Sequence, residues 1–88
     1  MMQKDSSKLF FVYALKSVAR NYIYVGLTDN LERRIKQHND GKSKTTKAYS
    51  PFVLIYSEVC DTRVAARKRE VYLKSGVGKS FLKKLIIQ

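Results

Sequence analysis

The side chains best suited to chemistry in this 88-residue chain are phenols, one guanidinium, one imidazole and one carboxylate. Residues 22–35, with the sequence YIYVGLTDNLERRI, pass from alternating tyrosines through a glycine toward a helix that carries two adjacent arginines. A guanidinium is costly to bury unless an anion meets it. The pattern therefore indicates a place where hydroxyls and an arginine approach an anionic group. The candidate residues are Tyr13, Tyr24, Arg34, His38 and Glu70.

The two tyrosines are expected to meet across a β-hairpin. Residues 8–15 and 22–27 are rich in aromatic and β-branched side chains, and a polar stretch separates them, which predicts two antiparallel strands. If residues 16–21 form the loop, Tyr13 lies directly opposite Tyr24 on one face. A tyrosine pair on a half-buried sheet face is also ordinary core material, so the pair alone does not identify a site.

Gly26 lies on the same face in this register, opposite Phe11. Glycine has no side chain, so the position would be left unfilled next to the tyrosines. We expect a substrate or a backbone segment to approach closely there.

A helix is expected after the second strand, and its buried face carries two of the candidates. Leu31, Ile35 and His38 follow the i, i+4, i+7 spacing of a core-facing row, and Arg34 falls on the same face. Arg33 points outward and reads as a solvated residue. A histidine in such a row is often a satisfied boundary residue, whereas an arginine there calls for an anionic partner.

The acidic residues can be sorted by elimination. Five have local explanations, namely Asp29 and Glu32 in a capping box, Asp61 as an alternative to Thr62 for a later cap, Asp40 in a turn, and Asp5 in the N-terminal tail. Glu58 and Glu70 remain. Ala66, Glu70 and Leu73 follow helical spacing, which places a carboxylate on an apolar row. A rival row through Lys68 would instead leave Glu70 in a surface ion-pair network.

The remaining pattern predicts an α+β fold. Residues 52–59 read as a third strand, followed by a helix that ends near Ser75 and a shorter helix over residues 79–87. The expected architecture is a small three-stranded antiparallel sheet flanked by helices, in the order β-β-α-β-α-α. The length predicts a single domain over residues 1–88, with a flexible tail at residues 1–7.

The charge points to a polyanionic partner. The chain has 18 lysines and arginines against 7 acids, a formal net charge of +11. Nucleic acid is the expected partner, and DNA is preferred. The single cysteine, Cys60, excludes a disulfide framework, and no stretch is apolar enough to span a membrane, so a cytoplasmic protein is expected. The expected nucleic-acid contacts are Lys42, Lys44, Lys47, Arg67 and Lys68.

The spacing of these motifs resembles the GIY-YIG nuclease domain. FVY ends at Tyr13, YVG follows at residues 24–26, LERRIKQH follows at residues 31–38, and REVYL contains Glu70. The similarity runs from about Leu9 to Leu85. The chain is most similar to the small stand-alone members, which are likened to the N-terminal domain of the C subunit of the excision-repair nuclease.

This resemblance implies a metal-dependent endonuclease that hydrolyses phosphodiester bonds in DNA and is structure-specific or repair-related. The family assigns one Mg²⁺ or Mn²⁺ ion to the residue matching Glu70, and the scissile phosphate to the residue matching Arg34. In the family, tyrosines that match Tyr13 and Tyr24 orient or activate the attacking water. The position of His38 is occupied by tyrosine or histidine. Whether Tyr13 acts as the base or as a relay is left open. The alternative is a non-catalytic nucleic-acid-binding module with the same fold.

Overall fold

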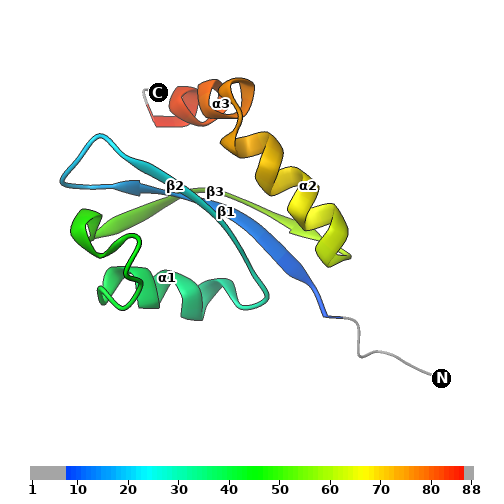
Figure 1. The fold of residues 1–88 in the computed structure, drawn as a ribbon, viewed down its shortest axis with the longest axis horizontal. Coiled ribbons are helices and arrows are strands. Elements are labelled where there is room, and N and C mark those ends of the chain that lie inside the picture. Colours follow the sequence, from blue (N-terminus) through cyan, green and yellow to red (C-terminus); the bar gives the residue numbers. More distant parts are fainter. Residues whose placement is uncertain (1–7, 87–88) are drawn as a thin grey trace.

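Three antiparallel strands form a sheet that carries helices on both faces (Figure 1). The computed structural model describes residues 8–86 of the chain. Strand β1 (Phe10–Ser17) lies in the middle, between β2 (Ile23–Thr28) and β3 (Phe52–Cys60). The α+β class is confirmed, while the tail predicted at residues 1–7 lies outside the described residues.

Three α-helices complete the fold of residues 8–86, and the predicted order β-β-α-β-α-α is confirmed. Helix α1 (Leu31–Asn39) follows β2, and a short 3₁₀ turn, η1 (Lys47–Tyr49), precedes β3. Helices α2 (Arg63–Lys74) and α3 (Gly76–Ile86) are separated only by Ser75, so α3 begins earlier than predicted. No helix within residues 8–86 is long and apolar enough to cross a membrane.

The helices begin at side-chain caps, but the predicted cap of α1 is wrong by one residue. The Asn30 side chain, not that of Asp29, accepts a hydrogen bond from the backbone N–H of Arg33 at 3.1 Å. The Thr28 hydroxyl accepts the N–H of Asn30 and holds it in this position. Of the two alternatives for α2, Thr62 is the cap.

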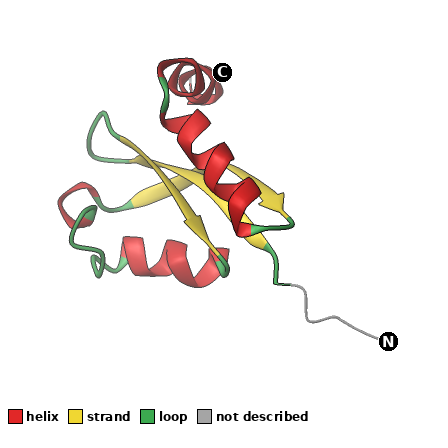
Figure 2. Cartoon of the chain, turned by 45° about the vertical axis from the view of Figure 1, so that its right-hand side comes forward, coloured by secondary structure: helices red, strands yellow, loops and turns green. Residues whose placement is uncertain are grey.

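The sheet separates two hydrophobic cores. Figure 2 shows α1 on one side of the sheet and α2 with α3 on the other. Alternate residues of β1 face opposite sides, as the strand period requires. The core beneath α2 and α3 contains Val12, Ala14, Val25, Ala66, Leu73 and Leu82, and the core beneath α1 contains Tyr13, Leu15 and Phe52 with Leu31 and Ile35 packed against them.

The predicted hairpin register is wrong by two residues. Tyr13 pairs with Gly26, not with Tyr24, and Tyr24 pairs with Leu15. Gly26 therefore does not lie opposite Phe11, which pairs with Thr28. A shift of two keeps every side chain on its predicted face, whereas a shift of one would have reversed them all. Tyr13, Tyr24 and Gly26 consequently still share the face that α1 covers.

The register differs because β1 extends further than its sequence predicts. Ser17 is the last strand residue, and its N–H donates to the carbonyl of Tyr22 at 2.9 Å, so the turn spans residues 18–21 only. The buried Ser17 hydroxyl donates to the carbonyl of Tyr49 at 2.6 Å and accepts the N–H of Arg20. These bonds to η1 and the turn lengthen the strand through residues that look like loop.

Candidate active site

A cluster of rings surrounds Tyr13 on the α1 face of the sheet. Tyr13 has no solvent exposure, and its hydroxyl lies 3.0 Å from Nε2 of His38, which is also fully buried. The ring centroid of Tyr24 lies 6.2 Å from that of Tyr13 and 4.8 Å from that of His38, within the range of favourable aromatic contacts. The structure thus brings three of the predicted site residues together from β1, β2 and α1.

The second nitrogen of His38 is held by a residue that the sequence did not identify. Nδ1 lies 2.8 Å from the hydroxyl of Thr46, a fully buried side chain just before η1. Thr46 occupies the N-cap position of η1 but makes no capping hydrogen bond. A neutral imidazole donates at one nitrogen and accepts at the other. Tyr13, His38 and Thr46 therefore form a buried chain of two hydrogen bonds. Both ring nitrogens have a partner whether the proton of the neutral imidazole is on Nε2 or on Nδ1.

Burial sets the protonation of this cluster. It raises the pKa of Tyr13 to about 12, an effect to which the neighbouring Tyr24 adds and which the Arg34 guanidinium opposes. Burial also lowers the pKa of His38 to about 4, with a further contribution from the positive charge of Arg34. Near neutral pH the site accordingly holds a protonated phenol beside an uncharged imidazole.

Arg34 lies beside the cluster, as its place on the helix predicts. It is half-buried, and its Nη1 donates to the Gln37 side-chain oxygen at 2.9 Å. Its charge acts on both Tyr13 and His38. The adjacent Arg33 is exposed and pairs with Asp29 at 3.7 Å, so the two neighbouring arginines have different surroundings.

Glu70 lies on the buried row of its helix and also takes part in ion pairs, so both of the alternatives that the sequence left open are present. It is only 7% exposed and shares the buried row of α2 with Ala66 and Leu73. Its carboxylate also accepts from Arg67 Nη1 at 3.0 Å and pairs with Lys74 Nζ at 3.2 Å. Helix α2 covers the face of the sheet opposite the Tyr13 cluster, and the negative charge of Glu70 is the smallest of the influences that raise the pKa of Tyr13.

The donor set suits one hard divalent cation at most. No group of three or more histidine, cysteine or acidic side chains gathers within residues 8–86. Glu70 offers two carboxylate oxygens, each with one cationic partner and further acceptor capacity. Mg²⁺ keeps several waters and is commonly bound by one or two carboxylates together with substrate phosphate. The residues present therefore fit a single, largely hydrated ion.

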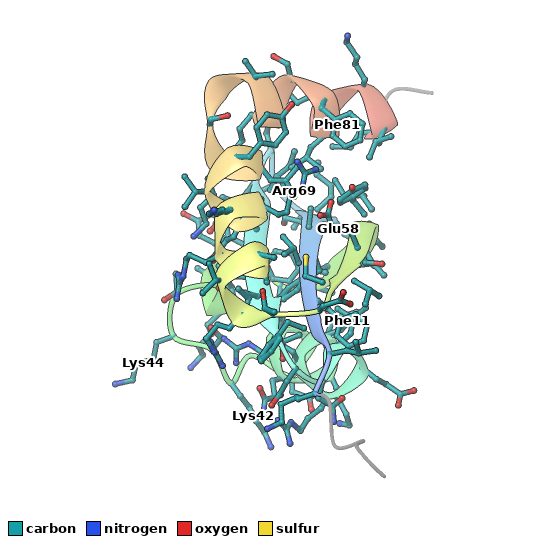
Figure 3. All side chains as sticks on the ribbon, turned by 90° about the vertical axis from the view of Figure 1, so that its right-hand side faces the viewer. Phe11, Lys42, Lys44, Glu58, Arg69 and Phe81 are labelled. Carbon is teal, nitrogen blue, oxygen red and sulfur yellow. The ribbon has the colours of Figure 1, made fainter. Side chains whose placement is uncertain are left out.

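Glu58, the other acid without a local explanation, has a structural role. Its carboxylate accepts two hydrogen bonds from Arg69, at 2.7 and 3.1 Å, and one from Tyr56 at 2.5 Å. Figure 3 shows Glu58 of β3 beside Arg69 of α2. This bidentate pair ties the strand to the helix and is not part of the Tyr13 cluster.

Gly26 is needed for Tyr13 to fit. A Cβ atom at this position would lie 2.5 Å from the Tyr13 hydroxyl oxygen and 2.8 Å from a ring carbon of Tyr24. The space above Gly26 is thus taken by the two tyrosines and is not left open, contrary to the expectation that a substrate would approach there. Its neighbour across the ladder is Tyr13 itself.

The predicted nucleic-acid contacts come from two separate layers of the fold. All five are exposed, with Lys42, Lys44 and Lys47 following α1 on one side of the sheet, and Arg67 and Lys68 on α2 on the other. Lys42 and Lys44 project at the opposite end of the molecule from Phe81 of α3 (Figure 3). The structure does not gather these residues on one element.

Comparison with known proteins supports the resemblance seen in the motifs. The sequence model of the GIY-YIG catalytic domain matches residues 9–84. A UPF0213 protein of Clostridium perfringens is 42% identical over 65 residues, which cover 73% of this chain and 69% of that protein. A UPF0213 protein of Vibrio parahaemolyticus is 36% identical over 74 residues, covering 83% of this chain and 69% of its own length.

A solved structure agrees with the fold. The solution NMR structure of a UPF0213 protein from Bacillus halodurans matches with a TM-score of 0.53 and 31% sequence identity. The match covers 88% of this chain and 84% of that one.

Proposed function

Because the chain belongs to the GIY-YIG catalytic domain family, a family of nuclease domains, we propose that it is a metal-dependent endonuclease acting on DNA. One observation carries the proposal: a phenol from β2 and a guanidinium and an imidazole from α1 gather at the Tyr13 phenol of β1, whose pKa the charge of Glu70 from α2 also raises. A structure-specific or repair-related substrate belongs to the same proposal, since no recognition helix for base reading stands out among the elements of residues 8–86.

Arg34 and Tyr24 are the residues that we expect to contact the substrate. Phosphodiester hydrolysis needs an oriented water and neutralised non-bridging oxygens. The half-buried Arg34 guanidinium supplies a fixed positive charge for the phosphate, and the half-buried Tyr24 is the phenol of the cluster that reaches solvent. Tyr24 is therefore assigned to orient the attacking water.

Tyr13 and His38 are assigned as positioning residues. Neither has any solvent exposure, and a phenol whose pKa is about 12 is almost entirely protonated near neutral pH. Both properties argue against direct abstraction of a proton from water by Tyr13. Through their hydrogen bond and ring contacts, the two residues instead fix Tyr24 and the charged end of Arg34.

Glu70 would hold the divalent ion, either Mg²⁺ or Mn²⁺. Such an ion, when bound, neutralises phosphate charge and lowers the pKa of a coordinated water. Arg67 and Lys74 hold the Glu70 carboxylate through their ion pairs. Glu70 of α2 and Arg34 of α1 then offer a negative charge for the ion and a positive charge for the phosphate.

The two neighbouring arginines of α1 provide the test. Purified protein is incubated with plasmid, flap and single-stranded DNA in Mg²⁺ or Mn²⁺, beside Arg34→Ala and the matched control Arg33→Ala. We expect cleavage that falls about a hundredfold in Arg34→Ala and little in Arg33→Ala. Retained binding without cleavage for every substrate and either metal would contradict the proposal and identify a non-catalytic nucleic-acid-binding module.

A further inference from the structure

Three open hollows lie end to end along the β2 edge of the sheet, between the hairpin and α3. Their volumes are about 310, 270 and 250 Å³. Tyr22 and Lys79 line both the first and the second, while Asn21 and Lys83 line both the second and the third. The shared walls make one continuous groove, and Figure 1 shows α3 passing beside the end of the hairpin.

Lysines line this groove along its whole length. The first hollow is lined by Lys74 and Lys79, and the second by Lys79 and Lys83. The third is lined by Lys83 and Lys16. Lys79 and Lys83 are four positions apart on α3 and so project from the same helix face. Among the described residues that line the groove, none is acidic. The lysine groove, as we call it, therefore presents a positive track to a polyanion.

The lysine groove begins at the candidate active site. Tyr24 lines its first hollow and also packs against the rings of Tyr13 and His38. Lys74 lines the same hollow and pairs with Glu70 at 3.2 Å. A strand whose phosphate lies at the site can consequently continue straight into the groove.

An aromatic platform stands beside the lysines. Tyr22 borders the first two hollows and stacks on Tyr49, with ring centroids 4.0 Å apart and an interplanar angle of 13°. The guanidinium of Arg20 lies 5.8 Å from the centre of the Tyr49 ring and steadies the stack. A positive groove with aromatic rings is the arrangement by which proteins bind single-stranded nucleic acid without reading its sequence.

Resting on the proposed nuclease function, we propose that the lysine groove binds the single-stranded continuation of the nucleic-acid chain that is cut. The hollows are small, at about 250 to 310 Å³ each, and only an unpaired strand can turn its bases toward an aromatic side chain at the wall of such a groove. Lys79 and Lys83 contact successive phosphates, and Tyr22, at the wall of the first two hollows, contacts the bases. The substrate class is therefore DNA with a single-stranded segment next to the scissile bond.

Binding without cleavage tests the groove separately from the enzyme. Fluorescence anisotropy with a short labelled oligothymidylate, in the absence of divalent metal, compares the wild type with the groove variant, Lys79→Ala/Lys83→Ala, and with a control variant, Lys8→Ala/Lys36→Ala, whose lysines lie outside the groove. Both variants lose two charges from exposed or half-exposed lysines, and alanine preserves the helix. Lys79→Arg/Lys83→Arg restores the charge, and circular dichroism checks the folding of each variant.

We expect the groove variant to bind roughly tenfold more weakly, with a log–log salt slope shallower by about 1.4, since each single-strand phosphate contact contributes about 0.7. The control variant should change the affinity by less than about twofold, and Lys79→Arg/Lys83→Arg should bind like the wild type. The proposal would be overturned by an equal loss of affinity in both alanine variants. It would also be overturned if the wild type bound a duplex more tightly than the oligothymidylate and the groove variant kept that affinity for the duplex.

The two proposals can fail independently. Groove-dependent binding of the oligothymidylate without cleavage in Mg²⁺ or Mn²⁺ would uphold the groove and reject the nuclease. Cleavage of a flap substrate that proceeds equally well in Lys79→Ala/Lys83→Ala, with unchanged affinity, would uphold the nuclease and reject the groove.

Discussion

The Tyr13 hydroxyl and Nε2 of His38 lie 3.0 Å apart in the interior, although 25 positions separate the two residues in the chain. Thr46 satisfies the other ring nitrogen of His38 at 2.8 Å. An imidazole held at both nitrogens has one orientation, and that orientation fixes the phenol it contacts. The site is therefore organised from its buried side, behind the residues that face solvent.

The low pKa of His38 predicts a loss of stability in mild acid. The pKa is about 4 in the folded chain, against an ordinary value of 6.5 in the unfolded chain. Between these pH values the unfolded state binds a proton that the folded state does not, so stability is unaffected above pH 6.5 and decreases as the pH falls. The full loss is about 3 kcal/mol. Urea unfolding of wild type and His38→Gln over this range measures it, and equal pH dependence in the two proteins would contradict the assignment.

Two replacements of Thr46 distinguish the contribution of its hydrogen bond to His38 from the contribution of its side-chain volume. Thr46→Val keeps the shape but removes the partner of Nδ1, and an unsatisfied buried nitrogen costs about 1–3 kcal/mol. We expect this loss of unfolding free energy and a reduced cleavage rate, because the ring can then turn away from Tyr13. Thr46→Ser retains the hydroxyl and should recover most of the rate. A Thr46→Val protein as active as Thr46→Ser would show that the bond positions nothing.

Gly26→Ala should displace the Tyr13 side chain while the overall fold is kept. The added Cβ would lie 2.5 Å from the Tyr13 oxygen and 2.7 Å from the carbon that bears it. Overpacking of this kind costs about 1–3 kcal/mol. A double-mutant cycle with Tyr13→Phe measures the interaction by urea unfolding, since removal of the hydroxyl relieves part of the overlap. Strict additivity of the two changes would argue against direct contact between the sites.

The element order and the faces of the strands and helices could be predicted from the sequence, because they depend on local periodicity. The row of Leu31, Ile35 and His38 and the row of Ala66, Glu70 and Leu73 both face inward as their spacing indicates. The N-cap of α1 and the hairpin register could not be predicted. The register depends on tertiary hydrogen bonds, such as the bond from Ser17 to Tyr49. The cap is a choice between two adjacent residues that can both cap a helix, Asp29 and Asn30, and the local bond from the Asn30 N–H to Thr28 favours Asn30.

The site could be predicted only as far as its residues carry patterns. Tyr13, Tyr24, Arg34 and His38 do converge. Thr46 could not be found, because a loop threonine has no periodicity and its contact depends on how the chain returns after α1. The lysine groove was also missed, since its walls come from the hairpin and α3, which lie far apart along the chain.

The junction of α2 and α3 offers a matched pair of glycines. A Cβ at Gly78 would overlap the backbone carbonyl oxygen of Tyr72, whereas one at Gly76 would meet nothing within 4 Å. We expect Gly78→Ala to lower the unfolding free energy by about 1–3 kcal/mol. Gly76→Ala should be neutral or stabilising by up to about 1 kcal/mol. Thermal unfolding of the two variants measures the difference, and similar midpoints would contradict the close packing of the helices.

The central claim is that Glu70 belongs to a metal-dependent phosphodiesterase site, and two glutamates allow a direct measurement. The single-turnover cleavage rate of a flap DNA in Mg²⁺ or Mn²⁺ is compared among the wild type, Glu70→Gln and Glu58→Gln, with folding verified for each. The account predicts a loss of about a hundredfold or more in Glu70→Gln and a rate near wild type in Glu58→Gln, whose carboxylate binds Arg69. Metal-dependent cleavage that survives in Glu70→Gln would contradict the account.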